Sequence, residues 1–258
     1  MHIVSVANQK GGVGKTTSVH NIGVALSRFH KQKVLLVDLD PQGNLTDSCG
    51  ADPEELRQTV YEVLDGKLEP DKAILDIEPG LKLLPTNQEM VDAELVFFSR
   101  KGRENLLKRA LQKVDAFDIV IIDCPPSLGL LTVNAFVASK YILAPIQAEY
   151  HALAGFAHIT NTLDEIRTSG LNPDLQLLGT FVPFFDARKR LNTDVADSLR
   201  KDQGNVLFKT KIRDTIALAD APSHGKNIFD YRSRSFGNDD YRQLSIELLK
   251  TLKGKAKE

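Results

Sequence analysis

Short, continuous apolar runs that alternate with helical stretches constrain the fold of this chain more than any other feature. Apolar strands without a polar face are buried on both sides, as in a parallel sheet that helices cover on each face. The helical stretches include residues 106–114, 152–166 and about 239–253. We therefore predict an α/β fold with a mostly parallel central sheet and helices on both faces. The predicted strands are residues 3–7, 34–37, 81–84, 119–122, 141–146, 175–182 and 206–208.

Length and composition favour a single domain over residues 1–258. The chain has 258 residues, of which 42% are hydrophobic, and this is enough for one sizeable core. No apolar stretch reaches the roughly 20 residues needed to cross a bilayer, so we expect no membrane association. The two cysteines, Cys49 and Cys124, give no disulfide framework and fit a reducing cytoplasm.

Charge is unevenly distributed along the chain, although the formal net charge is only −1. Residues 186–258 hold 16 Lys and Arg against 11 Asp and Glu. This excess of positive charge permits an anion-binding face near the C-terminal end. The ordinary interpretation of such an excess is a solvated surface, and charge alone favours it.

A glycine-rich loop lies between the first predicted strand and a helical stretch. Its glycines let the loop turn tightly, so that backbone N–H groups and the positive end of the helix can hold phosphate. Lys15 would neutralise phosphate oxygens, and the Thr16 hydroxyl would bind Mg²⁺. The sequence therefore predicts a nucleotide site. The loop residues expected to bind the nucleotide are Lys10, Gly11, Gly12, Val13, Gly14, Lys15, Thr16 and Thr17.

Acidic residues follow two other predicted strands directly. Asp38 and Asp40 come after residues 34–37, and Asp123 comes after residues 119–122. The carboxyl ends of parallel strands meet at one edge of a sheet, where ligands bind. A single Asp at a strand end is often only a helix cap, but several beside a phosphate loop favour a magnesium site. We expect Asp123 to hold Mg²⁺ through water.

Lys10 is a second cation at the start of the loop. It lies too far along the chain from Lys15 to do the same work from the same side. It could act within its own site or reach into the site of a partner, as an arginine finger supplied in trans does. The spacing alone does not choose between these two arrangements.

Four segments of the chain resemble motifs of one family. Residues 10–17 resemble the deviant Walker A motif of the ParA/MinD ATPases. Residues 37–44, 121–129 and 221–226 resemble the corresponding segments of the ParA/Soj branch. Together these segments extend across nearly the whole chain. The resemblance implies a P-loop NTPase that uses ATP and Mg²⁺ and hydrolyses ATP slowly on its own.

The same resemblance implies roles for individual residues. Lys10 would be the signature lysine, which contacts the nucleotide of the opposite subunit in an ATP-bound sandwich dimer. Asp40 would orient or activate the attacking water, so that Lys10, Lys15 and Asp40 form the catalytic set. Asp38 and Asp123 would support the magnesium that Thr16 binds. Gly12 would lie at the dimer interface. The residues that would border the adenine are Ile212, Arg213 and Asp214.

The resemblance further implies three kinds of partner: a second copy of the chain, non-specific DNA and a ParB-like protein that stimulates hydrolysis. The protein would be cytoplasmic, and nucleoid-associated when ATP is bound. One departure bears on DNA binding, because Asp214 and Ala217 stand where family members near Soj carry arginines. The cations expected to contact DNA are Arg188, Lys189, Arg190, Lys211 and Arg213.

Other interpretations of the sequence stay open at this point. A ParA-like ATPase could position a chemoreceptor cluster, a microcompartment or a cell pole instead of DNA. A MinD-like membrane switch would need an amphipathic tail, whereas residues 253–258 are small and charged. A protein similar to nitrogenase iron protein would need two cysteines per subunit at a cluster. A bacterial tyrosine kinase is less consistent with the tyrosines, which form no terminal cluster. A non-enzymatic binding module is less consistent with the presence of both Lys10 and Asp40.

Overall fold

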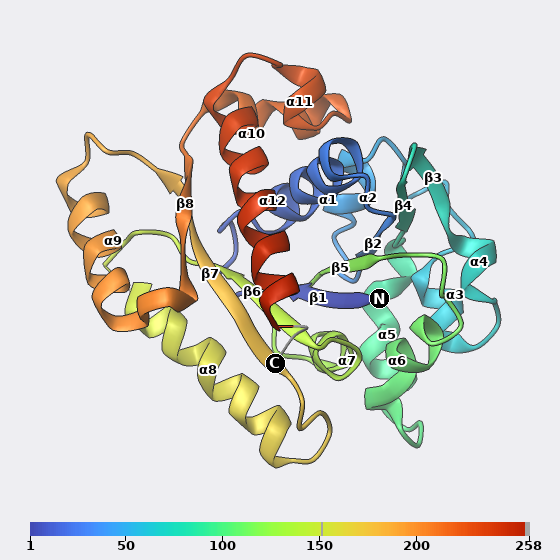
Figure 1. The fold of residues 1–258 in the computed structure, drawn as a ribbon. Coiled ribbons are helices and arrows are strands. Elements are labelled where there is room, and N and C mark those ends of the chain that lie inside the picture. The colour runs from blue at the N-terminus through green and yellow to red at the C-terminus, as the bar shows by residue number, and fades with distance from the viewer. Residues whose placement is uncertain (151, 256–258) are drawn as a thin grey trace.

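The computed structural model describes residues 1–150 and 152–255 of the chain. Eight strands form one sheet in the order β3-β4-β2-β5-β1-β6-β7-β8 (Figure 1). All neighbouring strands are parallel except β3, which pairs with β4 in the antiparallel direction. The strands are β1 (His2–Val6), β2 (Val34–Asp38), β3 (Leu75–Glu78), β4 (Leu81–Leu84), β5 (Ile119–Asp123), β6 (Tyr141–Pro145), β7 (Gln176–Phe185) and β8 (Leu207–Arg213).

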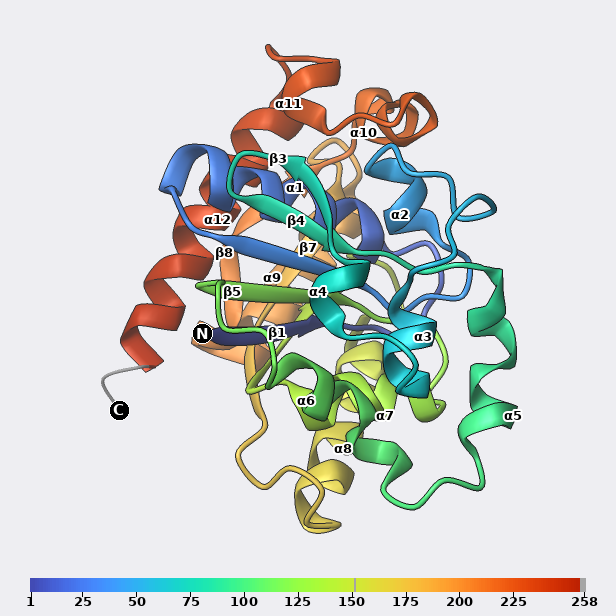
Figure 2. The ribbon, with the colours of Figure 1, turned by 90° about the vertical axis from the view of Figure 1, so that its right-hand side faces the viewer.

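Helices cover both faces of the sheet, so the predicted α/β architecture is confirmed. Figure 2 shows the two helical layers on opposite sides of the strands. The helices are α1 (Lys15–His30), α2 (Asn44–Ser48), α3 (Val60–Asp65), α4 (Pro70–Ala73), α5 (Ala93–Phe97), α6 (Leu106–Leu111), α7 (Leu130–Ala138), α8 (Ala152–Thr168), α9 (Arg190–Gln203), α10 (Ile216–Asp220), α11 (Ile228–Tyr231) and α12 (Phe236–Lys255). Short 3-10 helices connect several of these, among them η1 (Gln88–Asp92) and η4 (Ala221–His224).

The core divides into two layers because successive side chains of a strand point to opposite faces. In β5, Ile119 and Ile121 pack with the apolar side chains of α1 and α12. Val120 and Ile122 pack on the other face, with side chains of α3, α6, α7 and α8. All five residues of β5 are buried. The continuous apolar pattern of the sequence thus reflects burial on both faces.

Each of the seven predicted strands is present; the strand at 81–84 has the predicted ends, and the other six differ at one end or both. The strand predicted at 206–208 continues to Arg213, and the one predicted at 175–182 continues to Phe185. The helix expected over 106–114 ends at Leu111, and the last helix begins at Phe236. The edge strand β3 was not predicted from the sequence. It is half-buried at most and carries two acids in four residues, so it lacks the apolar run that marks the other strands.

The central strands bring their carboxyl ends to one edge of the sheet. β1 lies between β5 and β6, and β5 lies between β1 and β2. The pairing register places Val6 opposite Asp123 and Asp123 opposite Asp38. The loop after β1 therefore emerges beside the two acids that end β5 and β2. Within the described ranges no helix is long and apolar enough to span a membrane.

Candidate nucleotide site

The loop between β1 and α1 has the backbone of a phosphate cradle. Gly12 and Gly14 adopt left-handed conformations, with φ of 71° and 76°, which favour glycine over other residues. Gly14 is the N-cap of α1, which has 16 residues. The first turn of a helix has N–H groups without partners in the helix, and its dipole is positive at this end. The loop thus directs amide donors and positive potential at one point.

A cavity of about 490 Å³ opens at this loop, a volume in the range of small-molecule sites. It is lined by every loop residue from Gly11 to Thr17 and by Asp40. Several further residues were not predicted from the sequence. Three of them, Pro222, Ser223 and Lys226, lie in a segment that the motif comparison had singled out without giving it a role. The unpredicted lining residues are His20, Asn21, Gln42, Asn44, Asp47, Ser48, Pro126, Phe184, Pro222, Ser223 and Lys226.

Lys15 supplies the positive charge of this cavity. Its side chain is only 7% exposed, and its Nζ lies 3.5 Å from the carbonyl oxygen of Lys10. It forms no ion pair with a carboxylate of the described residues, so its charge is available to an anion in the cavity. A desolvated ammonium group interacts with phosphate more strongly than an exposed one.

Thr16 and Asp123 form the part of the site that fits magnesium. The Thr16 hydroxyl donates a hydrogen bond to Asp123 Oδ2 over 2.6 Å. The second carboxylate oxygen, Oδ1, is buried and has no hydrogen-bond partner. Burial and the neighbouring charge of Asp38 raise the pKa of Asp123 well above its usual value. A buried carboxylate with an unsatisfied oxygen beside a threonine hydroxyl matches the oxygen ligands that Mg²⁺ takes, directly or through water.

Asp38 lies behind this pair and is engaged with its own chain. Its Oδ2 accepts hydrogen bonds from the amide and the hydroxyl of Thr46, at 2.9 and 2.7 Å. Its Oδ1 accepts from the amide of Asp40 over 3.2 Å. Burial raises the pKa of Asp38 to about 7, against the lowering effect of the Thr46 bonds. Asp38 can therefore act on a metal ion through its charge or through the position of the loop, while Asp123 keeps an open oxygen.

Asp40 stands at the wall of the cavity, where the loop after β2 turns. It is 7% exposed, and its Oδ1 accepts a hydrogen bond from the amide of Gln42 over 3.0 Å. The other carboxylate oxygen has no such bond to this loop. This position suits a group that orients a water molecule inside the cavity.

Lys10 points away from the nucleotide cavity, which it does not line. Its Nζ donates to Gln147 Oε1 over 3.0 Å and forms an ion pair with Glu149 over 2.5 Å. These residues belong to a neighbouring, smaller cavity of about 240 Å³. The Lys10 side chain stays 54% exposed. The structure thus separates the two lysines of the loop, one inside its own site and one at the surface.

The three residues expected to border the adenine do not line the cavity. Ile212 is fully buried in the core layer with α1 and α12. Arg213 pairs with Asp240 over 2.6 Å. The amide of Asp214 donates to the carbonyl oxygen of Phe185. Phe184 of the neighbouring strand β7 lines the cavity instead, and its ring lies next to Gly14. Phe184 itself has a φ of 52°, a strained conformation for an aromatic residue.

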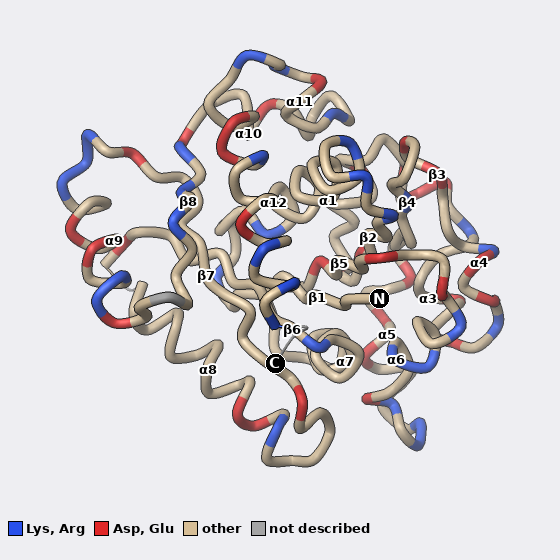
Figure 3. Tube along the Cα trace, viewed as in Figure 1, with Lys and Arg blue, Asp and Glu red and all other residues tan. Residues whose placement is uncertain are grey.

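The cations expected to contact DNA lie on β8, on the loop before α9 and at the first residue of α9, in regions where Figure 3 shows basic residues. Three of them are paired with carboxylates: Arg188 with Asp186, Arg190 with Asp194 and Arg213 with Asp240. The guanidinium side chain of Arg188 is nevertheless 91% exposed. The ammonium group of Lys211 lies 4.1 Å from the centre of the Phe185 ring. Lys189 is exposed and forms no ion pair among the described residues.

Comparison with known proteins agrees with these features. A family model for an AAA domain matches residues 1–177. The sporulation initiation inhibitor protein Soj of Bacillus subtilis is 40% identical over 252 residues, which cover 95% of this chain and 97% of that protein. The chromosome-partitioning ATPase Soj of Thermus thermophilus is 42% identical over 246 residues, with 95% and 94% covered. The chain belongs to the ParA/Soj family of ATPases.

Two solved structures with a similar fold contain a bound nucleotide. Cobyrinic acid a,c-diamide synthase of Mycobacterium smegmatis, bound to an ATP analogue and magnesium, has a TM-score of 0.85 and 40% identity, and covers 98% of this chain and 96% of its own. McdA of Cyanothece in complex with ATP has a TM-score of 0.85 at 21% identity, which supports the fold alone. This ParA/Soj protein is accordingly a P-loop ATPase with ATP and Mg²⁺ as its cofactors.

The two cysteines do not favour a metal cluster. Both are free thiols, with Cys124 buried at the end of β5 and Cys49 partly buried after α2. Burial raises the pKa of each thiol, so both are held protonated, whereas a cluster binds thiolates. Among the described residues no group of three or more His, Cys, Asp or Glu side chains is arranged to hold a metal ion.

Proposed function

We propose that the chain is an ATP-dependent positioning switch of the ParA/Soj type. In this proposal two copies enclose ATP between them, and the ATP-bound dimer binds DNA non-specifically. Hydrolysis, which is slow in the protein alone and faster with a ParB-like partner, separates the copies and releases DNA. The ATP-bound form would then be associated with the nucleoid. Relatives named chromosome-partitioning ATPase Soj and chromosome partitioning protein ParA support this proposal.

The observation that carries the proposal is the position of Lys10. A cation at the start of a phosphate loop that does not face its own cavity can serve a nucleotide held by a second copy, as an arginine finger supplied in trans does. Lys10 is half exposed and lies outside its own nucleotide cavity. The adjacent Gly11 and Gly12 are open, because a Cβ added at either would meet nothing within 4 Å. A second copy could therefore approach this loop closely, with each Lys10 leaving Glu149 for the phosphate of the other copy.

In this proposal each residue of the cavity has its own role in hydrolysis. Lys15 neutralises charge on the phosphates and stays in place throughout. Asp40 orients the attacking water and can accept its proton. Thr16 and Asp123 would hold magnesium, which supplies positive charge on the phosphate oxygens when bound. Because Lys10 binds only while the terminal phosphate remains, hydrolysis removes the contact that favours the dimer.

ATP-dependent DNA binding by the purified protein tests the proposal. We expect retention of a non-specific duplex with ATP or a non-hydrolysable analogue, and little retention with ADP. Contacts with DNA phosphates release counterions, so binding should weaken steeply as salt is raised. Equal DNA binding with ATP and ADP would contradict the switch.

The absence of DNA binding in the presence of a normal ATP-dependent dimer would point to the alternative cargo. A ParA-type ATPase that positions a protein assembly keeps the nucleotide chemistry and does not need the DNA contact. The pairing of Arg188, Arg190 and Arg213 with acids makes this a real alternative. A pull-down with the dimer locked by a non-hydrolysable analogue would then identify the cargo.

A further inference from the structure

The nucleotide cavity continues beyond the phosphate loop to a wall that the mechanism of hydrolysis does not use. Phe184 of β7 and Pro222 of η4 supply its apolar groups. Its polar side chains come from α1, from α2, and from η4 and the residues just after it. A nucleotide whose phosphates are held at the loop has this wall left for its ribose and base.

Three polar side chains of this wall are already engaged by their own chain. The Asn21 side chain donates to the carbonyl oxygen of Thr17 over 2.7 Å and accepts from the amide of Ile228 over 2.8 Å. The hydroxyl groups of Ser48 and Ser223 each donate to the backbone carbonyl three residues earlier. These groups hold α1, α2 and η4 in shape.

His20 is buried in the same wall, and its own chain does not engage it. The side chain is 3% exposed and lines the cavity. Neither ring nitrogen has a hydrogen-bond partner among residues 1–150 and 152–255, and neither is fully enclosed by protein, unlike Oδ1 of Asp123. Buried polar groups are normally paired. The imidazole is therefore available to a partner inside the cavity.

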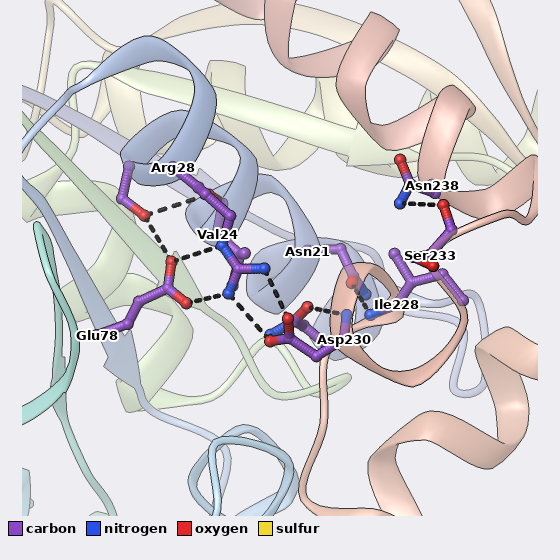
Figure 4. A network of polar contacts seen from close by, with 10 residues as sticks. Asn21, Val24, Arg28, Glu78, Ile228, Asp230, Ser233 and Asn238 are labelled. Carbon is purple, nitrogen blue, oxygen red and sulfur yellow. Dashed lines mark hydrogen bonds and ion pairs between the residues drawn. The ribbon is translucent and has the colours of Figure 1, made fainter.

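The surroundings of His20 keep its ring neutral. Arg28 pairs with Asp230 over 2.7 Å and also with Glu78, in the network that Figure 4 shows between α1, β3 and α11. The side chain of Asn227 donates to Asp230 Oδ2 over 2.7 Å. Burial lowers the pKa of His20 to about 4, against the opposing effect of Asp230. A neutral imidazole offers one donor and one acceptor, which fits a hydroxyl group and adds no charge for a phosphate.

The position of His20 on α1 favours the ribose over the other parts of a nucleotide. His20 lies four residues after Thr16, so the two side chains share a face of the helix. One turn of α-helix advances about 5.4 Å, which places His20 just beyond the phosphate end of the cavity. The ribose connects the phosphates to the base. The apolar groups of Phe184 and Pro222 suit the flat faces of the base itself.

We propose that His20 forms a hydrogen bond with a ribose hydroxyl of the bound nucleotide and so makes the site select ribonucleotides over deoxyribonucleotides. His20 is then a specificity-determining residue, which acts on the nucleoside and not on the transferred phosphate. The next residue, Asn21, connects the same turn of α1 to α11 through Ile228. The proposal rests on the nucleotide site alone and depends neither on the pairing of two copies nor on DNA.

Titration calorimetry with Mg²⁺ and three diphosphates tests the contact: ADP, 2′-deoxy-ADP and 3′-deoxy-ADP. Diphosphates avoid both hydrolysis and the ATP-dependent pairing of copies. We expect the wild type to bind ADP about threefold to tenfold more tightly than the analogue that lacks the contacted hydroxyl, in line with the loss of one hydrogen bond. Equal affinity of the wild type for all three ligands would overturn the proposal without the need for any variant.

The variant His20→Leu removes both ring nitrogens and keeps an apolar side chain in the wall. We expect it to bind ADP and the deoxy analogues equally well. His20→Gln keeps a donor and an acceptor and should retain a preference between those of His20→Leu and the wild type. His158→Leu replaces an exposed histidine of α8 and is the matched control, which should keep the full preference. An unchanged preference for ADP in His20→Leu would overturn the proposal even if the overall affinity falls, and so would a preference lost in the control.

Discussion

The positions of several residues in the nucleotide cavity depend on short-range geometry and could be predicted from the sequence. The sequence predicted Lys15, Thr16 and Asp40 beside one site, because the spacing of a glycine-rich loop and the ends of parallel strands leave few other arrangements. His20 and Asn21 were not predicted as cavity residues. They are polar residues one turn beyond the loop, just before the apolar run from Ile22 to Leu26, and this was the available signal.

The partners of Lys10 could not be predicted. Gln147 and Glu149 lie 137 and 139 residues away along the chain, and only the parallel pairing of β1 with β6 brings them to the loop. Nothing in the local sequence marks a surface glutamate as the counter-ion of a particular lysine. The separation of Lys10 from Lys15 therefore had to come from the structure.

Lys15→Ala should abolish ATP binding at ordinary concentrations. Removal of a charged partner from a desolvated ion pair costs about 2–5 kcal/mol, which corresponds to a loss of affinity of about 30-fold or more. Titration calorimetry with a non-hydrolysable analogue measures the effect. Lys33→Ala, an exposed lysine before β2, is the control and should bind as the wild type does. Normal affinity in Lys15→Ala would show that the cavity is not the nucleotide site.

His20 should make the folded protein sensitive to acid. Its side chain is 3% exposed, and burial lowers its pKa from 6.5 to about 4, against the opposing effect of Asp230. The unfolded chain therefore takes up a proton near pH 6.5 while the folded protein does not, and stability falls as the pH falls from there toward 4. Between pH 7 and pH 5 the wild type should lose about 2 kcal/mol more than His20→Gln. Urea unfolding at both pH values provides the comparison, and equal losses would refute the prediction.

At the scale of elements, most strands could be predicted from the sequence because they are buried on both faces. β2 and β5 are buried at every position, and their apolar runs have no interruption. β3 escaped prediction because an antiparallel edge strand needs only a partial apolar face. The start of α12 at Phe236 also escaped prediction. Its first turn contains Gly237 and Asn238, which are unfavourable in helices and are held here by Leu218, Ile228 and Ser233.

The packing of β7 against β8 should depend on a single glycine. A Cβ added at Gly179 would lie 2.2 Å from an edge carbon of the buried Phe208 ring. Gly179→Ala should therefore destabilise the protein by about 1–3 kcal/mol through overpacking. Gly155→Ala in α8 is the matched control, because a Cβ there meets nothing within 4 Å. It should stabilise the helix by up to about 1 kcal/mol. Denaturant unfolding measures the change in the free energy of unfolding for both variants. A Gly179→Ala variant as stable as the wild type would contradict this account of the packing.

For the whole molecule, the order of the strands explains why one edge of the sheet carries the chemistry. The loops after β1, β2 and β5 meet there because these strands are adjacent and parallel. The sequence predicted this class of fold, since alternating apolar runs and helices allow little else. It did not predict the strand order beyond that, nor the contact between α11 and α1 that connects the nucleotide cavity to the C-terminal surface. The strand order depends on long-range pairings such as Val34 with Ile119. The α11 contact depends on a still longer one, between Arg28 and Asp230, which lie 202 positions apart.

The central claim is that two copies enclose ATP and that each contributes Lys10 to the other. Sedimentation analysis with a non-hydrolysable ATP analogue and Mg²⁺ measures this directly. We predict a species of twice the 28.6 kDa chain mass for the wild type, and a monomer under the same conditions for Lys10→Ala, which should still bind the analogue in its own cavity. A wild-type protein that binds the analogue and stays monomeric, or a Lys10→Ala variant that dimerises equally well, would contradict the account.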